Sequence, residues 1–336
     1  MSADCYVGAT TGAFKLINLK EERFTNAQPL EKLKPKEHGI VGMCFVDNSQ
    51  TEVLTLQKNG DVNFYNTVTG DYTKLFETEN TEAGGPAKAI QLTVNDRIVV
   101  AHENGHVQIY NQEGSPQIGD GFEAGANLNF LITDPNNREV ALTGGKENTL
   151  KLWDLERKAT LWSMKNLKDD YLSLRIPIWE ANGRFVKDSK LICTTTGHHQ
   201  IRLFDPKRQR KPVISLDWHE NPIRAISTCH REEHVIAGNN CGELALFDLR
   251  GKIRPVHKFR GGSGAIRCID AHPTEKLVAS VGIDRFLLVH DVDTKRTLHK
   301  IYLKTQLSSV LFSKVNSLTN PIKDEEPEVV TKFFEG

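Results

Sequence analysis

The fold is decided by the stretch Gly144-Gly-Lys-Glu-Asn-Thr-Leu-Lys-Leu-Trp-Asp154, in which a polar turn precedes a strand-like run. The end of that run recurs along the chain as an apolar or aromatic residue followed by Asp or Asn. The seven copies are Lys15-Leu-Ile-Asn18, Asn63-Phe-Tyr-Asn66, Gln108-Ile-Tyr-Asn111, Lys151-Leu-Trp-Asp154, Arg202-Leu-Phe-Asp205, Ala245-Leu-Phe-Asp248 and Leu288-Val-His-Asp291. Successive Asp or Asn positions are separated by 48, 45, 43, 51, 43 and 43 residues.

Each copy lies in a unit of four expected strands. A second β run and a turn rich in Gly and Asn precede it, as in Val53-Leu-Thr-Leu-Gln-Lys-Asn-Gly60, and Asn-Gly between two strands favours a tight hairpin. An earlier strand such as Ala265–Asp270 and a later one such as Thr297–Tyr302 flank the hairpin. A four-stranded unit that repeats every roughly 40–45 residues is a propeller blade. The sequence therefore predicts an all-β protein, a seven-bladed β-propeller.

The two ends of the chain predict how the ring closes. The first copy begins at Cys5 and has no innermost strand before it, whereas an extra strand-like run, Gln306–Phe312, follows the last complete repeat. We expect this run to complete the first blade, which removes an open sheet edge. The predicted propeller thus spans residues 1–312, and the acidic residues 313–336 are expected to form a disordered tail.

Composition indicates an intracellular protein with an uneven charge. No apolar run approaches the roughly 18 residues of a membrane helix, no secretory signal is visible, and the six cysteines form no C-x-x-C pair. Residues 1–150 hold 12 Lys and Arg against 20 Asp and Glu, whereas residues 151–312 hold 28 against 18. The basic second half suggests an anionic partner.

The repeats resemble the WD-repeat superfamily, with Trp153-Asp154 as the clearest copy of its name-giving dipeptide. In the last repeat, His272-Pro273, Asp284 and Asp291 resemble the recurrent His and Asp positions of that superfamily. We interpret His272 and Asp284 as a structural hydrogen-bonded pair rather than a catalytic dyad. Membership of such a superfamily predicts a fold and says little about function.

A closer resemblance is carried by the connection between the fourth and fifth repeats, Asp169-Asp-Tyr-Leu-Ser-Leu-Arg-Ile-Pro-Ile-Trp-Glu180. This segment resembles the WD repeat-containing protein 74 family of nucleolar factors in large ribosomal subunit assembly. Gly197–Pro206, Ala279–Arg285 and Ile301–Leu307 are similar to that family as well. The resemblance implies a protein of the nucleolus and nucleus that joins the pre-60S ribosomal particle, contacts ribosomal RNA and assembly-factor proteins, and is released by an AAA-type ATPase. It departs from the family at its acidic end, where a Lys- and Arg-rich tail is usual.

Four consecutive repeats carry basic residues in the turn between their third and fourth strands, which predicts a continuous basic surface. These residues are Arg157, Lys158, Lys207, Arg208, Arg210, Lys211, Arg250, Lys252, Arg254, Lys295 and Arg296. Such a surface suits RNA, because neutralised phosphates release counterions. The alternative is that exposed turns are charged only for solubility.

The opposite face is predicted to bind proteins through Tyr171, Arg175 and Trp179, together with Arg260 and Arg285 near the mouth of the channel. Aromatic and Arg side chains in an extended loop are typical of binding hot spots. The alternative is that Leu172, Leu174, Ile176, Ile178 and Trp179 pack the connection onto the blades, and the alternation of apolar residues favours this for Trp179.

We expect no enzymatic activity, no metal and no cofactor. His198-His199 has no acidic or thiol partner at useful spacing, no G-x-S-x-G motif occurs, and Gly261-Gly-Ser-Gly264 lacks the lysine of a phosphate-binding loop. We expect a scaffold protein that is monomeric outside the particle and does not contact a membrane. A substrate receptor of a cullin-type ubiquitin ligase is the alternative, because Phe247-Asp-Leu-Arg250 resembles the W-D-x-R motif of such receptors.

Overall fold

The recurring Asp or Asn has a structural role at the end of the third strand in six of the seven blades. Its side-chain oxygen accepts amide N–H groups of the turn that follows, which is the geometry that favours Asx residues in turns. Asp154 accepts from Arg157 at 2.9 Å and Asp291 from Thr294 at 2.9 Å, and the side chains of Asn18, Asn66, Asp205 and Asp248 accept in the same way. The repeat in the sequence is therefore a repeat of turn geometry.

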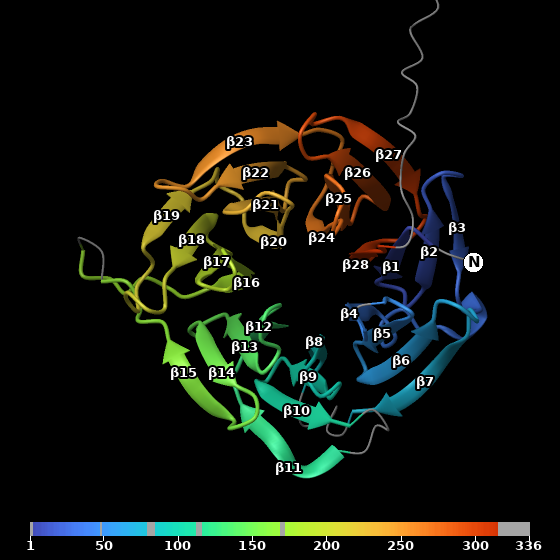
Figure 1. Ribbon diagram of the computed structural model, residues 1–336, viewed down its shortest axis with the longest axis horizontal. Helices are drawn as coiled ribbons and strands as arrows, with labels where there is room; N and C mark the ends of the chain where they lie inside the picture. The colour runs from blue at the N-terminus through green and yellow to red at the C-terminus, as the bar shows by residue number, and fades with distance from the viewer. Residues whose placement is uncertain (1–2, 48, 79–84, 112–115, 169–171, 315–336) are drawn as a thin grey trace, which may run out of the picture.

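The computed structural model describes residues 3–47, 49–78, 85–111, 116–168 and 172–314. It shows seven four-stranded antiparallel sheets arranged as blades around a central axis (Figure 1), as the sequence predicts. The only helical element in the described residues is a short 3-10 helix, η1 (Leu30–Lys32), and no described helix is long and apolar enough to span a membrane.

The strands of the first four blades are as follows, from the axis outward. Blade 1 contains β28 (Leu307–Phe312), β1 (Cys5–Ala9), β2 (Phe14–Asn18) and β3 (Arg23–Asn26). Blade 2 contains β4 (Ile40–Phe45), β5 (Glu52–Gln57), β6 (Asp61–Asn66) and β7 (Tyr72–Glu77). Blade 3 contains β8 (Ala87–Leu92), β9 (Ile98–His102), β10 (His106–Tyr110) and β11 (Pro116–Glu123). Blade 4 contains β12 (Leu128–Thr133), β13 (Val140–Gly145), β14 (Lys151–Asp154) and β15 (Ala159–Ser163).

The remaining three blades follow the same order. Blade 5 contains β16 (Glu180–Val186), β17 (Leu191–Thr196), β18 (Gln200–Phe204) and β19 (Ile214–Asp217). Blade 6 contains β20 (Ile223–Thr228), β21 (His234–Asn239), β22 (Leu244–Asp248) and β23 (Arg254–Phe259). Blade 7 contains β24 (Ile266–Ala271), β25 (Leu277–Gly282), β26 (Phe286–Asp291) and β27 (Thr297–Tyr302).

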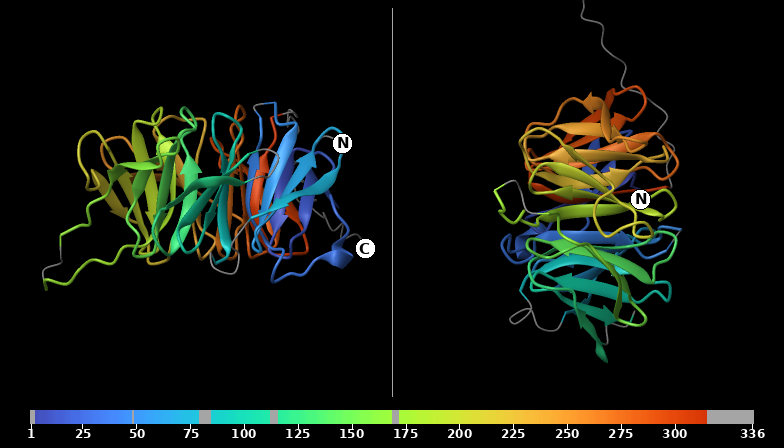
Figure 2. Two further views of the ribbon diagram at one scale, coloured as in Figure 1. Left: turned by 90° about the horizontal axis from the view of Figure 1, so that it is seen from below. Right: turned by 90° about the vertical axis from the view of Figure 1, so that its left-hand side faces the viewer.

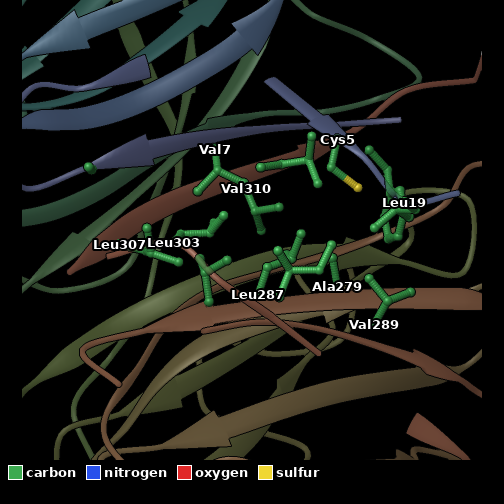
Figure 3. Packing of buried hydrophobic residues seen from close by; sticks show 14 of the residues in the cluster. Cys5, Val7, Leu19, Ala279, Leu287, Val289, Leu303, Leu307 and Val310 are labelled. Carbon is green, nitrogen blue, oxygen red and sulfur yellow. The ribbon is translucent and has the colours of Figure 1, made fainter. Parts of the chain in front are cut away.

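The ring is closed by the last strand of the chain, which confirms the prediction from the two ends. Strand β28 pairs antiparallel with β1, with Val310 opposite Val7 and Phe312 opposite Cys5. A buried apolar cluster extends this closure from blade 1 into blade 7 (Figure 3), and Leu303, Leu307 and Val310 are at most 2% exposed. The acidic tail predicted after residue 312 lies outside the described residues from 315 onward.

Candidate interaction surfaces

The ring has two faces that recurring backbone hydrogen bonds define. On the hairpin face, the turns after the first strands bond the turns after the third strands. Examples are the amides of Leu155, Leu249 and Val292, which donate to the carbonyls of Glu139, Glu233 and Lys276, each at 2.8 Å. On the connection face, the turns after the second strands bond the segments that enter the first strands. There Lys58, Lys146, Asn240 and Ile283 donate to Gly39, Asn127, Pro222 and Ala265 at 2.8 to 3.1 Å.

The predicted RNA-binding residues all lie in or next to third-to-fourth-strand turns, and therefore on the hairpin face. Arg157 and Lys158 follow β14, Lys207 to Lys211 follow β18, Arg250 to Arg254 lie between β22 and β23, and Lys295 and Arg296 lie between β26 and β27. Most of these side chains are exposed, with Arg157 at 81% and Arg254 at 71%. The turns belong to four neighbouring blades (Figure 1), so the sequence pattern does produce one basic arc.

Several cations of this arc are already engaged by the protein. Arg250 contacts both carboxylate oxygens of Asp248 at 3.0 Å, and Arg254 adds a third contact at 3.2 Å. The Arg250 guanidinium is the main reason why the pKa of the Asp248 carboxyl lies well below its usual range. In blade 5, the Arg210 guanidinium donates to the Ser163 carbonyl at 2.6 Å, which ties this turn to the outer strand of blade 4.

A groove of about 640 Å³ between blades 5 and 6 brings two of the predicted cations together. Arg208 and Arg250 line it with Lys187, but Asp205 and Glu233 line it as well. The Lys187 ammonium pairs with Glu233 at 2.6 Å. The arc therefore has mixed charge in this groove, because the repeated Asp that ends each third strand lies directly beside the basic turn.

The signature connection between blades 4 and 5 extends away from the ring on both sides of its undescribed part, residues 169–171 (Figures 1 and 2). Tyr171 thus lies outside the described residues. Leu172 and Leu174 are each 60% exposed, whereas Ile176 is half-buried and Ile178 is only 3% exposed. The alternative that all five apolar residues of the connection are buried on the blades is wrong for Leu172 and Leu174. The C-terminal part of the connection is the part that is buried against the blades.

Glu147, in the turn between β13 and β14, holds that C-terminal part. Its carboxylate pairs with Arg175 at 2.7 Å and accepts the amide N–H of Ile178 at 3.1 Å, and its own amide donates to the Ile178 carbonyl at 2.8 Å. The bond from Ile178 is the main reason why the pKa of Glu147 is lowered. Arg175 remains 61% exposed, so it is anchored and still accessible to a partner.

Trp179 is half-buried at the inner end of the connection, so its ring both packs on the blades and remains partly accessible. Its ring lies against the backbone of Gly197, at which a Cβ atom would come within 2.1 Å of the ring. The His198 ring meets it edge-on at 5.6 Å, and Lys146 and Arg224 lie over it at 5.4 and 5.8 Å from the centroid. Directly behind it, Glu180 and Arg202 form an ion pair at 3.2 Å with side chains 0% and 3% exposed.

Arg260, which follows β23, and Arg285, which follows β25, are both exposed and belong to other blades than Arg175 and Trp179. Arg285 has a φ of 68° and its guanidinium reaches the Tyr302 hydroxyl at 3.5 Å. Neither arginine is among the residues that line the channel. The arginines that line it are Arg184, Arg224 and Arg267 on β16, β20 and β24.

His272 and Asp284 are not a pair. His272 follows β24 on the hairpin face, where its Nδ1 accepts the amide N–H of Glu275 at 2.9 Å. Asp284 lies in the turn after β25 on the connection face and accepts the amide N–H of Phe286 at 3.2 Å. The two residues stand at opposite ends of the blade, and each stabilises its own turn. In the described part of the chain, no three His, Cys, Asp or Glu residues are placed to hold a metal ion.

The seven four-stranded blades and the recurrent strand-end Asp or Asn define the class of protein as a WD-repeat β-propeller. The WD domain, G-beta repeat family matches residues 253–291 directly. Over almost the whole chain, the sequence is 31% identical to WD repeat-containing protein 74 from Bos taurus, with 97% of this chain and 85% of the relative covered. The human protein of the same name is also 31% identical at the same coverage.

The chain belongs to the WD repeat-containing protein 74 family. Ribosome biogenesis protein nsa1 from Schizosaccharomyces pombe is similar at 22% identity, with 98% of this chain and 93% of the relative covered. The similarity thus extends over all seven blades.

Proposed function

We propose that this protein is a non-enzymatic assembly factor in biogenesis of the large ribosomal subunit. Its membership of the WD repeat-containing protein 74 family, together with relatives named ribosome biogenesis proteins, carries this proposal. A rigid ring with two chemically different faces suits a scaffold, because each face can hold a different component. Such a role places the protein in the nucleus and nucleolus, on the pre-60S particle.

The basic arc of the hairpin face is the surface that we assign to pre-ribosomal RNA. Exposed cations on four neighbouring blades, among them Arg157, Lys207, Arg208 and Lys252, can neutralise several phosphates of a folded RNA without reading its sequence. The family resemblance supports release by an AAA-type ATPase. The exposed part of the signature connection, with Leu172, Leu174 and Arg175, is the surface that we assign to an assembly-factor protein.

Purification of the tagged full chain from growing cells tests the proposal. We expect precursor RNA and proteins of the large subunit, and accumulation of the protein on these particles when the ATPase cannot hydrolyse ATP. A ligase adaptor in place of ribosomal precursors would instead support the alternative reading of Phe247-Asp-Leu-Arg250 as a receptor motif.

A charge-reversed variant tests the arc. Replacing Lys207, Arg208, Arg210 and Lys211 with Glu should lower recovered precursor RNA at least tenfold and reduce the salt dependence of binding, since several phosphate contacts are lost. Lys20→Glu with Arg23→Glu, on the hairpin face of blade 1 outside the arc, is the control. Unchanged RNA recovery from the fourfold variant would contradict the assignment.

A further inference from the structure

Each of the seven innermost strands has a β-bulge at the same place, its second residue. In β24, for example, Ile266 pairs with Gly282 and Cys268 with Val281, which leaves Arg267 without a ladder partner. The equivalent bulged residues are Val41, Lys88, Asn129, Ala181, Arg224, Arg267 and Ser308. Bulges at the rim of a closed structure redirect a side chain away from the sheet. All seven residues line one cavity of about 740 Å³ at the connection face, the mouth of the channel.

The charged side chains of this mouth all have the same sign. Among the described residues that line the cavity, the charged ones are Lys36, Lys58, Lys88, Arg184, Arg224 and Arg267, and none is acidic. Lys88 has a carboxylate partner, Glu103, at 3.4 Å. Arg224 and Arg267 have no ion pair with any described carboxylate, which distinguishes them from Arg250 and Arg254 on the hairpin face.

The surroundings of these cations favour an added negative charge. Arg184 donates to the Asn182 side chain and the Gly183 carbonyl, at 3.2 and 2.9 Å, and burial lowers its pKa. Burial, and then the neighbouring positive charge of Arg267, lower the pKa of Arg224. Cations that repel one another inside a concavity focus a positive potential, and an anion bound between them relieves the repulsion.

The side chains on the other wall of the mouth favour a peptide over an RNA strand as the ligand. Val41, Met43 and Ile132 of blades 2 and 4 line it with aliphatic side chains. The aromatic liners are Phe130, which is 5% exposed, and the half-buried Trp179, whose ring lies against Gly197 with Lys146 and Arg224 over it. Proteins that hold single-stranded RNA stack its bases on open aromatic rings, and the described lining has none. A peptide that alternates carboxylate and aliphatic side chains would match both the cationic wall and the aliphatic wall.

We propose that the channel mouth on the connection face binds an acidic, aliphatic-rich peptide segment of a partner protein. Arg224 and Arg267 would pair with its carboxylates, and the wall at Val41 and Met43 would take its aliphatic side chains. The site is on the face opposite the basic arc and does not depend on RNA binding by that arc. It therefore adds a third binding surface to the basic arc and the signature connection.

The test uses the purified full chain and a fluorescein-labelled peptide in which Asp, Glu and Leu alternate over twelve residues. Fluorescence anisotropy should report binding in the micromolar range at physiological salt. Arg224→Glu with Arg267→Glu should weaken the peptide at least tenfold, because both charge pairs become repulsive. Lys20→Glu with Arg23→Glu, two exposed cations of blade 1 with the same change in charge, should leave the affinity unchanged.

The location of binding is read separately from the indole N–H resonance of Trp179, assigned by comparison with Trp179→Phe. This resonance should shift when the peptide is added, because Arg224 lies over the ring. Absence of binding up to millimolar peptide, equal affinity in the two charge-reversed variants, or preferential binding and displacement by a twelve-residue oligouridylate would each overturn the proposal. Loss of RNA recovery by the arc variant with peptide binding retained would show that the two surfaces act separately.

Discussion

The two faces of the ring carry cations in different chemical settings. On the hairpin face, Arg250 and Arg254 hold Asp248, and Arg231 and Lys276 hold Asp293. At the channel mouth, Arg224 and Arg267 line one cavity, and neither has an ion pair with a described carboxylate. A charge that is already paired contributes less to binding than one held unpaired in a concavity. The number of basic residues is therefore a poorer guide to a binding surface than their partners.

The faces also differ in what supports them. The mouth rests on the core, because Trp179 is followed directly by Glu180 in the buried ion pair with Arg202. Burial raises the pKa of Glu180, and Arg202 opposes that shift. The basic turns rest instead on exposed side chains and on Asx-type hydrogen bonds such as Asp154 to Arg157. Substitutions of equal type should consequently have unequal effects on the two faces.

The largest effect is expected from Arg202→Met. It leaves the Glu180 carboxylate buried without its counter-charge, which costs about 3–5 kcal/mol of the free energy of unfolding. Urea denaturation followed by circular dichroism measures this loss. Arg250→Met removes an arginine that is 60% exposed, and the nearly buried Asp248 keeps Arg254 as a partner at 3.2 Å, so this change should cost less. Equal losses of stability in the two variants would contradict the claim that the channel mouth depends on buried contacts and the hairpin face on more exposed ones.

The sequence predicts the ring well, because each blade repeats the same local chemistry. Blade number, the closing strand β28 and the face on which the basic turns lie all follow from strand-end Asp or Asn residues and their spacing. The bulged second residues of the innermost strands were not predicted. Each blade contributes one of them, and their side chains range from aliphatic, as in Val41, to charged, as in Arg267. The one available signal was that Arg224 and Arg267 stand 43 residues apart, one repeat, at the start of equivalent strands.

Contacts between segments that are not part of the repeat could not be predicted from the sequence either. The alternation of Leu172, Leu174, Ile176 and Ile178 predicts one buried edge, but alternation alone does not say how far the segment stays on the blades. That depends on Glu147, a residue of another turn, which binds Arg175 and Ile178 and nothing described before them in the connection. The contribution of Glu233 to the mixed charge of the basic arc was hidden for the same reason, since Glu233 comes from a different turn than Arg208.

A smaller effect is expected from Gly197→Ala, which pushes directly on Trp179. The added Cβ would lie 2.1 Å from the ring, so Trp179 must move, at a cost of about 1–3 kcal/mol of the free energy of unfolding. The Trp179 indole resonance should shift at the same time. Combining the change with Trp179→Leu should recover part of the loss, because the clash is removed. Additive losses in this double-mutant cycle would show that Gly197 does not position the ring.

The smallest expected effect concerns the pH dependence of stability. Two buried or paired carboxylates, Asp270 and Asp293, should contribute to it with opposite signs. Asp270 on β24 is buried behind the mouth, where its carboxylate accepts the Phe312 amide at 2.8 Å, and burial raises its pKa to about 6. The folded state thus holds a proton that the unfolded chain has released, and stability falls as the pH rises from about 4 to about 6. On the hairpin face, hydrogen bonds from Lys276 and Arg231 lower the pKa of Asp293 to about 2, so its contribution is present above about pH 4 and is lost in acid.

Asp270→Asn should accordingly remove a loss of about 1 kcal/mol in the free energy of unfolding between pH 5 and pH 7. Urea denaturation at both pH values measures the slope, and the Asn side chain can still accept the Phe312 amide that joins β28 to the mouth. Asp248→Asn is the control on the other face. Its partners Arg250 and Arg254 stay charged, so the change should lower stability above about pH 4 without altering the slope from pH 5 to pH 7. If Asp270→Asn keeps the slope of the parent chain, the carboxylate is already ionised in the folded ring, and the wall behind Arg267 is more polar than its burial indicates.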